Sequence, residues 1–181
     1  MGELIENIHT FVVPGGLPYT FETRWTYDSW NRMDSIYYPD GEMVAYHDDN
    51  GGKLVSMDGV KDSQTYTYIE DVKYSKYGSR TRIDYGNNTY ALYTYNPLNQ
   101  RLTNMISYEQ TGRVLQDINY SYDAASNITG IQNNSDYVGY NTDLGGGYKY
   151  LYQYDDLYRL LSAEGSTNTS NNGTLAFETS M

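Results

Sequence analysis

The chain has 181 residues, carries a net charge of −11 and contains no cysteine. Its 23 acidic residues against 12 basic ones argue against nucleic acid as a partner, and the missing thiols exclude disulfides and thiolate chemistry. Tyrosine is the outstanding residue type, with 23 copies, while good helix formers never cluster at helical spacing. This composition favours half-buried sheets, in which a tyrosine ring packs and its hydroxyl reaches water or a partner.

Residues 1–24 are predicted to form an N-terminal hairpin that caps the fold. The apolar run Phe11-Val12-Val13 leads into Pro14-Gly15-Gly16, which combines one fixed φ with two unrestricted ones, and residues 19–27 alternate back. Further strands are predicted at 33–38, 43–47 and 54–57, separated by turns at 28–31, 39–41 and 48–52.

One phrase recurs down the chain: two alternate aromatic residues, a turn opened by Asp or Asn, and a basic or polar residue before the next strand. Copies lie near residues 27, 47, 74, 95, 122 and 154. The turn-opening side chain can accept hydrogen bonds from backbone N–H groups two residues on, and the basic side chain can lie across a neighbouring ring. The predicted structural residues of the motif are Tyr27, Asp28, Arg32, Tyr95, Asn96, Arg101, Tyr122, Asp123, Tyr154, Asp155 and Arg159.

The copies define a repeat region at 25–164, in which the block at 74–102 repeats the block at 27–54. One unit of two strands and two turns is too small to be stable alone, so each unit must be covered by the next. The predicted fold is therefore all-β, a long, twisted antiparallel β-strip of hairpin repeats. Its partners are the neighbouring repeats, and its open strand edges predict self-association between copies.

Two stretches depart from the repeat. Residues 132–147, rich in Asn, Gly and Asp, are predicted to form a mobile loop. Residues 165–181 are predicted to form a flexible tail rich in Ser, Thr and Asn, with one short strand-like run at Leu175-Ala176-Phe177.

The motif resembles the tyrosine-aspartate (YD), or RHS, repeat. The resemblance covers roughly residues 25–163 and rests on the six copies, with Tyr38-Pro39-Asp40-Gly41 following the first of them. In RHS toxins, wall-associated proteins, subunits of insecticidal toxin complexes and teneurins, such repeats form a β-strip that spirals into a hollow shell. In the toxins the shell encloses a C-terminal effector. This chain departs from the family pattern because it is too short to close a shell and lacks the Asp-Pro-rich, self-cleaving segment that follows the repeats in many toxins.

The resemblance implies a non-enzymatic structural segment, part of the wall of an RHS-type β-shell. Such a segment would help to encapsulate or display another part of a larger secreted or surface protein, either a toxin or a cell-contact protein. It also implies an extracellular or cell-surface location within a larger bacterial protein, although this chain shows no signal peptide. No apolar run has the length of a membrane span, so membrane insertion is not expected.

No catalytic, cofactor-binding or metal-binding residues are predicted, and no cofactor is expected. His47 takes a motif tyrosine position beside Asp48 but has no second histidine or cysteine at ligand spacing, so it is interpreted as one ring replacing another. The stretch Asp48 to Gly52 resembles the start of a calcium loop, but Gly59 stands where that loop requires a bidentate Glu.

Carbohydrate binding is the alternative function. Exposed aromatic side chains on a sheet can stack on sugar rings, and the candidates are Trp30, Tyr37, Tyr38 and Tyr77. The aromatic residues also recur with the motif, as core positions would. Rings buried between strands would favour the structural function, and a solvent-facing row of rings would favour glycan binding.

Overall fold

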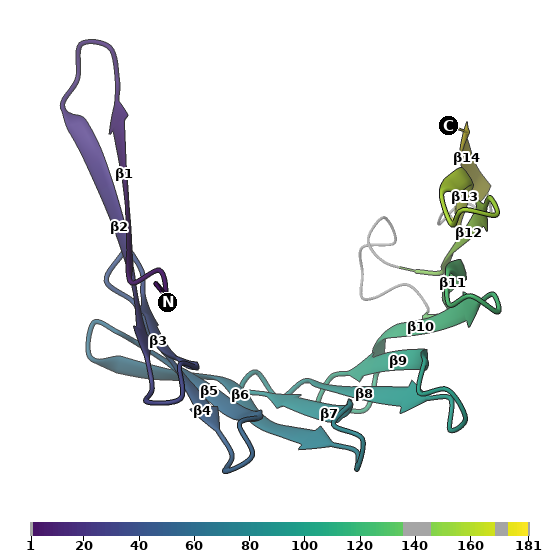
Figure 1. Cartoon of the computed structure of the whole chain (residues 1–181), viewed down its shortest axis with the longest axis horizontal. Coiled ribbons are helices and arrows are strands. Elements are labelled where there is room, and N and C mark those ends of the chain that lie inside the picture. The colour runs from purple at the N-terminus through teal and green to yellow at the C-terminus, as the bar shows by residue number, and fades with distance from the viewer. Residues whose placement is uncertain (1, 136–145, 169–173, 181) are drawn as a thin grey trace. The chain divides into compact units, whose positions relative to one another are not determined.

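The computed structural model describes residues 2–135, 146–168 and 174–180. These residues form strands and turns without a helix, and the fourteen strands lie in the sheet in the order in which they occur in the chain (Figure 1). Each described pairing is antiparallel. The predicted all-β fold, a strip of consecutive antiparallel hairpins, is confirmed. The described part of the chain holds no helix with the length and apolarity that a membrane crossing requires.

The chain divides into two compact units, residues 1–73 with 83–87 and residues 74–82 with 88–181. The first unit contains β1 (Glu6–Val12), β2 (Pro18–Tyr27), β3 (Met33–Tyr37), β4 (Met43–Asp48), β5 (Leu54–Lys61) and β6 (Gln64–Tyr74) up to Lys73. The second unit contains β8 (Tyr90–Tyr95), β9 (Leu102–Tyr108), β10 (Val114–Tyr122), β11 (Ile128–Asn133), β12 (Tyr148–Tyr154), β13 (Leu160–Asn168) and β14 (Thr174–Ser180). The residues of β7 (Arg80–Tyr85) are divided between the two units.

The N-terminal hairpin is continuous with the repeat region. β1 and β2 pair without interruption from Glu6 opposite Arg24 to Val12 opposite Pro18. β2 then runs on past residue 24 to Tyr27 and pairs with β3. One long strand therefore belongs both to the hairpin and to the first copy of the motif.

The two-residue turn between β5 and β6 contains no glycine, proline or asparagine. Asp62 and Ser63 connect the strands, with Lys61 opposite Gln64, and both turn residues have positive φ, 50° and 63°. Two consecutive positive φ values are typical of the two-residue hairpin turn of type I′, which usually contains Asn or Gly. Neither residue is present here, so this hairpin was not predicted.

The structure differs from the prediction at the C-terminal end. Residues 165–168 continue β13 and residues 174–180 form β14, which pair from Ser162 opposite Ser180 to Asn168 opposite Thr174. A Ser- and Thr-rich segment can take this conformation because a partner strand satisfies its backbone N–H and C=O groups. Residues 165–168 and 174–180 thus belong to strands, and β14 includes the run Leu175-Ala176-Phe177 for which a short strand was expected, while residues 169–173 lie outside the described residues. Of the predicted loop at 132–147, residues 132 and 133 belong to β11, and residues 136–145 also lie outside the described part.

The described strip has few buried apolar side chains. In the first unit Val44, Val72 and Ile83 are buried, and in the second unit Ala91 and Ile118 are buried. Most other strand side chains, including many tyrosines, are half-buried. Cross-strand pairs and the hydrogen bonds of half-buried tyrosines therefore hold these strands together to a greater extent than a deep core does.

Candidate functional site

The motif turns share one backbone geometry. In each, the N–H of the first residue donates to the C=O four residues on, and the N–H of the fourth residue donates back to the first C=O. The fourth residue has positive φ, which corresponds to a β-turn followed by a bulge residue. Turns of this kind span 28–32, 49–53, 75–79, 123–127 and 155–159. The turn at 96–101 has one additional residue, and there Asn96 N–H donates to Arg101 C=O at 2.8 Å.

The side chain of the first residue in each turn stabilises the turn by accepting hydrogen bonds from backbone N–H groups of the same turn. Asp28 Oδ1 accepts from Trp30 N–H at 2.8 Å and from Arg32 N–H at 3.0 Å, and Asp155 Oδ1 accepts from Leu157 N–H and Arg159 N–H, both at 2.9 Å. These backbone hydrogen bonds, above all those from Arg32 and Arg159, lower the pKa of Asp28 and of Asp155 below the ordinary value. The carboxylates are therefore held in their charged form.

Two further turn-opening residues show the same function with small differences. Asn96 Oδ1 accepts from Leu98 N–H at 2.8 Å, so an amide serves in place of the carboxylate. Asp123 accepts from both the side-chain amide of Asn127, at 2.8 Å, and the Asn127 N–H, at 2.9 Å. The side-chain hydrogen bond from Asn127 is the main cause of the lowered pKa of Asp123.

The strand register corrects the alignment of the second copy. The pairing shifts by one residue just before Tyr27, which faces Met33, and likewise just before Asp48, which faces Leu54. Asp48 therefore takes the motif tyrosine position, and Asp49 opens the turn by accepting from the backbone. The sequence interpretation placed His47 in the tyrosine position, and this was wrong by one residue because a histidine resembles tyrosine more closely than an aspartate does.

Motif tyrosines connect each copy to the strand before it. Tyr122 Oη donates to Leu102 C=O at 2.9 Å, and Tyr154 Oη donates to Ile128 C=O at 3.0 Å. Both acceptors are the first residue of the strand that follows the preceding motif turn. Tyr27 Oη makes the corresponding bond to Leu4 C=O at 3.0 Å, in the segment before β1.

Motif arginines connect copies in the opposite direction. Arg101 lies over the Tyr122 ring, 5.6 Å from its centroid, and donates to Asp123 C=O at 2.6 Å and to Ala124 C=O at 3.1 Å. Its guanidinium is therefore bound by the next motif turn. We call this arrangement of a motif tyrosine ring and two turn carbonyls the arginine seat.

In the first unit, Arg32 reaches the same position of the next copy. It holds Asp28 through Nε at 2.7 Å, and its Nη1 lies 3.4 Å from the carboxylate of Asp48, the residue in the tyrosine position. Arg159 binds Asp155 through Nε at 2.7 Å in the same way as Arg32 binds Asp28. Each arginine is thus oriented by its own turn.

The candidate glycan-stacking residues belong to two different units of the chain. Trp30, Tyr37, Tyr38 and Tyr77 are all exposed, with Trp30 at 78%. Trp30 lies in the turn before β3 and Tyr38 directly after β3, so the two rings stand at opposite ends of that strand. Tyr77 belongs to the second unit. Cationic side chains lie over three of these rings: Arg32 over Trp30, Arg24 over Tyr37 and Lys76 over Tyr77.

The residues considered for metal or acid–base chemistry are not assembled into such a site. His47 Nε2 lies 3.2 Å from Asp58 Oδ2, on the adjacent strand, and both side chains are substantially exposed. Among the described residues, no group of three His, Cys, Asp or Glu side chains is placed to hold a metal ion.

A polar network across β9, β10 and β11 was missed by the sequence reasoning. Asn104 donates to Asp117 Oδ1 at 2.6 Å, and the Asp117 N–H donates to Asn133 Oδ1 at 2.9 Å. The buried Asn133 also donates to Gly146 C=O at 3.1 Å, which joins the end of β11 to a residue two positions before β12. Nothing in an Asn- and Asp-rich sequence distinguishes these residues from turn residues before the strand pairing is known.

Comparison with protein families gives no matching family model. Among curated proteins, the chain is similar to two toxin subunits of Yersinia entomophaga, YenC2 and YenC1, with 32% and 29% identity over 111 residues. Each alignment covers 59% of this chain and 11% of the relative. The chain therefore spans about one tenth of the length of these relatives.

Solved structures show the same fold. The crystal structure of TcdB2–TccC3–Cdc42 matches with a TM-score of 0.72 and 23% identity, covering 90% of this chain and 8% of that chain. The structure of the Photorhabdus luminescens Tc holotoxin pore, with a TccC3 substitution, matches with a TM-score of 0.68 and 26% identity, covering 81% of this chain and 7% of that chain.

Proposed function

We propose that this chain is a non-enzymatic wall segment of an RHS-type β-shell in a larger secreted or surface bacterial protein. The shell would encapsulate or display another part of that protein, and the neighbouring repeats of the same protein would be the partners of this segment. Its location would be extracellular or at the cell surface. The similarity to toxin subunits supports a toxin as the parent protein.

The observation that carries this proposal is how the motif side chains are used. Tyr122 and Tyr154 bind the strand of the preceding copy, Arg101 binds the turn of the following copy, and Asp28 and Asp155 bind the backbone of their own turns. These side chains are engaged in joining one hairpin to the next. A strip joined in this way extends by repetition, as a wall requires.

Carbohydrate binding gains no support from the placement of the candidate rings. Trp30 and Tyr38 stand at opposite ends of β3, so a monosaccharide stacked on Trp30 would not also stack on Tyr38. A glycan array checks this point directly. Saturable binding that free sugar competes and that Trp30→Ala weakens would overturn the structural proposal.

The wall function is tested by a chimera. The aligned segment of the Yersinia entomophaga subunit YenC2 is replaced by this chain, and the chimera is exposed to protease. We expect its C-terminal part to stay as protected as in the parent subunit. The matched control carries Arg101→Ala and Tyr122→Phe in the same graft and should lose protection at lower protease concentration. Equal digestion of the two chimeras would contradict the proposal.

A further inference from the structure

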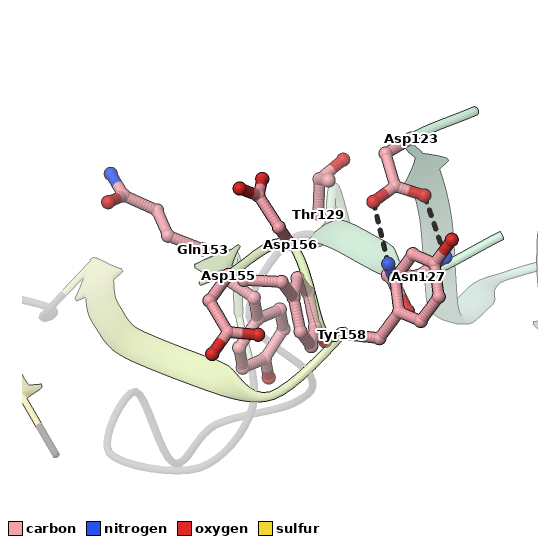
Figure 2. A pocket seen from close by; sticks show the side chains of 9 residues that line it. Asp123, Asn127, Thr129, Gln153, Asp155, Asp156 and Tyr158 are labelled. Atoms are coloured by element: carbon pink, nitrogen blue, oxygen red, sulfur yellow. Dashed lines mark hydrogen bonds between the residues drawn. The ribbon is translucent and has the colours of Figure 1, made fainter. Parts of the chain in front are cut away.

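A cavity of about 650 Å³ lies between the consecutive motif turns at 123–127 and 155–159 (Figure 2). Tyr152, Tyr154, Asp155 and Asp156 line one side of it, and Asn127 and Thr129 line the other. The residues that line it include no lysine or arginine. The corresponding space between the preceding pair of turns contains the guanidinium of Arg101.

The register shows that this cavity contains an arginine seat without its arginine. Arg101 sits on the Tyr122 ring and on the carbonyls of Asp123 and Ala124. One copy further along the chain, the equivalent groups are the Tyr154 ring and the carbonyls of Asp155 and Asp156, and all three residues line the cavity. The ring and the two turn residues that bind guanidinium in one copy are thus repeated in the next.

Asn127 leaves this second seat unfilled. It holds the position before the new strand that Arg101 holds in the preceding copy and Arg32 in the first. Its short side chain turns back to Asp123, with its N–H and side-chain amide on the two carboxylate oxygens (Figure 2). An asparagine is too short to reach the next turn as arginine does, so the space beside Tyr154 remains open.

The second seat has one additional carboxylate, Asp156, while Asp155 is already paired with Arg159 at 2.7 Å. Asp156 replaces Ala124 at the second turn position and is exposed. Hydrogen bonds from Arg159 and Leu157 keep the pKa of Asp155 low, so this side chain is charged at neutral pH. Tyr158, the fourth residue of the turn at 155–159, adds a further exposed ring to the lining of the cavity. Aromatic faces and carboxylates together select a cation, and a planar guanidinium matches the seat best.

We propose that the cavity at Tyr154 binds the guanidinium of an arginine side chain supplied by another polypeptide segment. The guanidinium would stack on Tyr154 and donate to the carbonyls of Asp155 and Asp156, with Asp156 adding charge attraction. The net charge of −11 favours the approach of such a basic segment. This inference does not depend on whether the chain belongs to a shell.

The test uses the full chain and Nα-acetyl-arginine amide as the probe, followed by amide chemical shifts in NMR spectra. We expect saturable shifts at millimolar probe concentrations, centred on Tyr154, Asp155 and Asp156. The matched neutral probe, Nα-acetyl-citrulline amide, has the same shape without the charge and should bind about tenfold more weakly. Linear shifts spread over all acidic turns would show non-specific attraction and would overturn the proposal.

Two variants locate the site. Asn127→Arg supplies the guanidinium from within the chain and should abolish the saturable shifts while raising the Tm. Gln110→Arg adds the same charge on an exposed turn between β9 and β10 and should leave probe binding unchanged. Binding that survives Asn127→Arg, or that Gln110→Arg removes equally, would contradict this assignment. Because the probe titration on the unmodified chain is independent of the YenC2 chimera, failure of one proposal is distinguishable from failure of the other.

Discussion

At the scale of single residues, the motif tyrosine has two separate tasks. Its ring provides the surface on which an arginine stacks, as Tyr122 does for Arg101, and its hydroxyl donates to the strand before it. Phenylalanine could perform the first task but not the second, because it lacks a donor. Tyrosine is therefore favoured over phenylalanine at these motif positions.

Tyr122→Phe separates these two tasks. It removes the hydrogen bond to Leu102 C=O and should lower the free energy of unfolding by about 0.5–1.5 kcal/mol, measured by urea denaturation at pH 7. Tyr77→Phe, at an exposed ring in a turn, is the control and should have no measurable effect.

The Tyr122 contribution also has a defined pH range. Burial raises the pKa of Tyr122 above its ordinary value, so the donor is fully present below the unfolded pKa and is lost as pH rises through the folded pKa. The difference between wild type and Tyr122→Phe should therefore disappear at strongly alkaline pH. A difference that stays constant through that range would contradict the hydrogen-bond explanation.

A second residue-scale prediction concerns Gly86, which follows β7. A Cβ on this residue would lie 1.7 Å from the Thr67 carbonyl oxygen, a backbone atom that cannot move without displacing β6. Gly86→Ala should therefore lower the Tm by several degrees in a thermal melt. Gly16→Ala, where a Cβ meets only ordinary contacts at 3.5 Å or more, is the matched control. Equal Tm values for the two variants would show that this close approach is relieved at little cost.

At the scale of the element, the hairpin turns depend on charged carboxylates. Asp28, Asp123 and Asp155 each have a lowered pKa, caused by hydrogen bonds within their own turns. A depressed folded pKa means that the stabilisation is present above the unfolded pKa, about 3.9, and is lost as pH falls through the folded pKa. The turns should therefore loosen in acid.

This acid sensitivity is measured by the urea midpoint between pH 7 and pH 2.5. The midpoint should be constant near neutrality and fall below about pH 4. A variant with Asp28→Asn, Asp123→Asn and Asp155→Asn keeps an acceptor oxygen in each turn, as Asn96 does naturally, but cannot ionise. It should show a clearly smaller loss in acid, and an unchanged loss would place the titrating groups elsewhere.

The sequence predicts strands and turns well where the motif is complete. It predicts them poorly where the pairing with a neighbouring strand determines whether a segment is a strand and in which register it lies. The turns at 28–32, 123–127 and 155–159 follow from Asp and its neighbours, which act locally. The pairing of β13 with β14 arises from hydrogen bonds between segments whose composition resembles a linker. The shift that puts Asp48 in the tyrosine position depends on a bulge in the strand register, which residue similarity does not reveal.

The arginine seat at Tyr154 illustrates the same limit for the site. Asn127 is an ordinary turn residue in the sequence, and its significance depends on which copy it faces. The sequence shows that Tyr154 is equivalent to Tyr122. Only the structure shows that the Tyr122 ring and the following two carbonyls bind the guanidinium of Arg101. Sequence reasoning therefore identifies the motif without showing which of its positions is unfilled.

At the scale of the whole molecule, β1 is an edge strand of the sheet that the described residues form. β1 occupies the first position, and its seven residues contain no lysine, proline or bulge, which are the usual protections of an edge strand. Val12 is 72% exposed on this strand, and Ile8 and Phe11 are exposed as well. An edge of this kind can pair with another strand.

Self-association through β1 is therefore expected at tens of micromolar protein, with a light-scattering mass above that of one 20.7 kDa chain. Val12→Lys places a charge on the edge strand and should shift the mass toward a single chain. Val13→Lys adds the same charge just outside the strand and serves as the control. A wild-type mass equal to one chain would contradict edge pairing.

The two ends of the strands differ in how they tolerate change. At one end, the motif turns have nearly constant length, so the tyrosine and arginine contacts recur in the same geometry from copy to copy. At the other end the connections vary, from two residues at Asp62-Ser63 to the long segment between Asn133 and Tyr148. Because adding length to an exposed connection costs little free energy, foreign peptides should be accepted at exposed connections of this second end such as residues 13–17, but not at Gly86, which lies against Thr67. The motif turns thus fix the spacing between strands, while the connections at the opposite strand ends can differ in sequence. Peptides of other origin could therefore be inserted at the exposed ones among those connections.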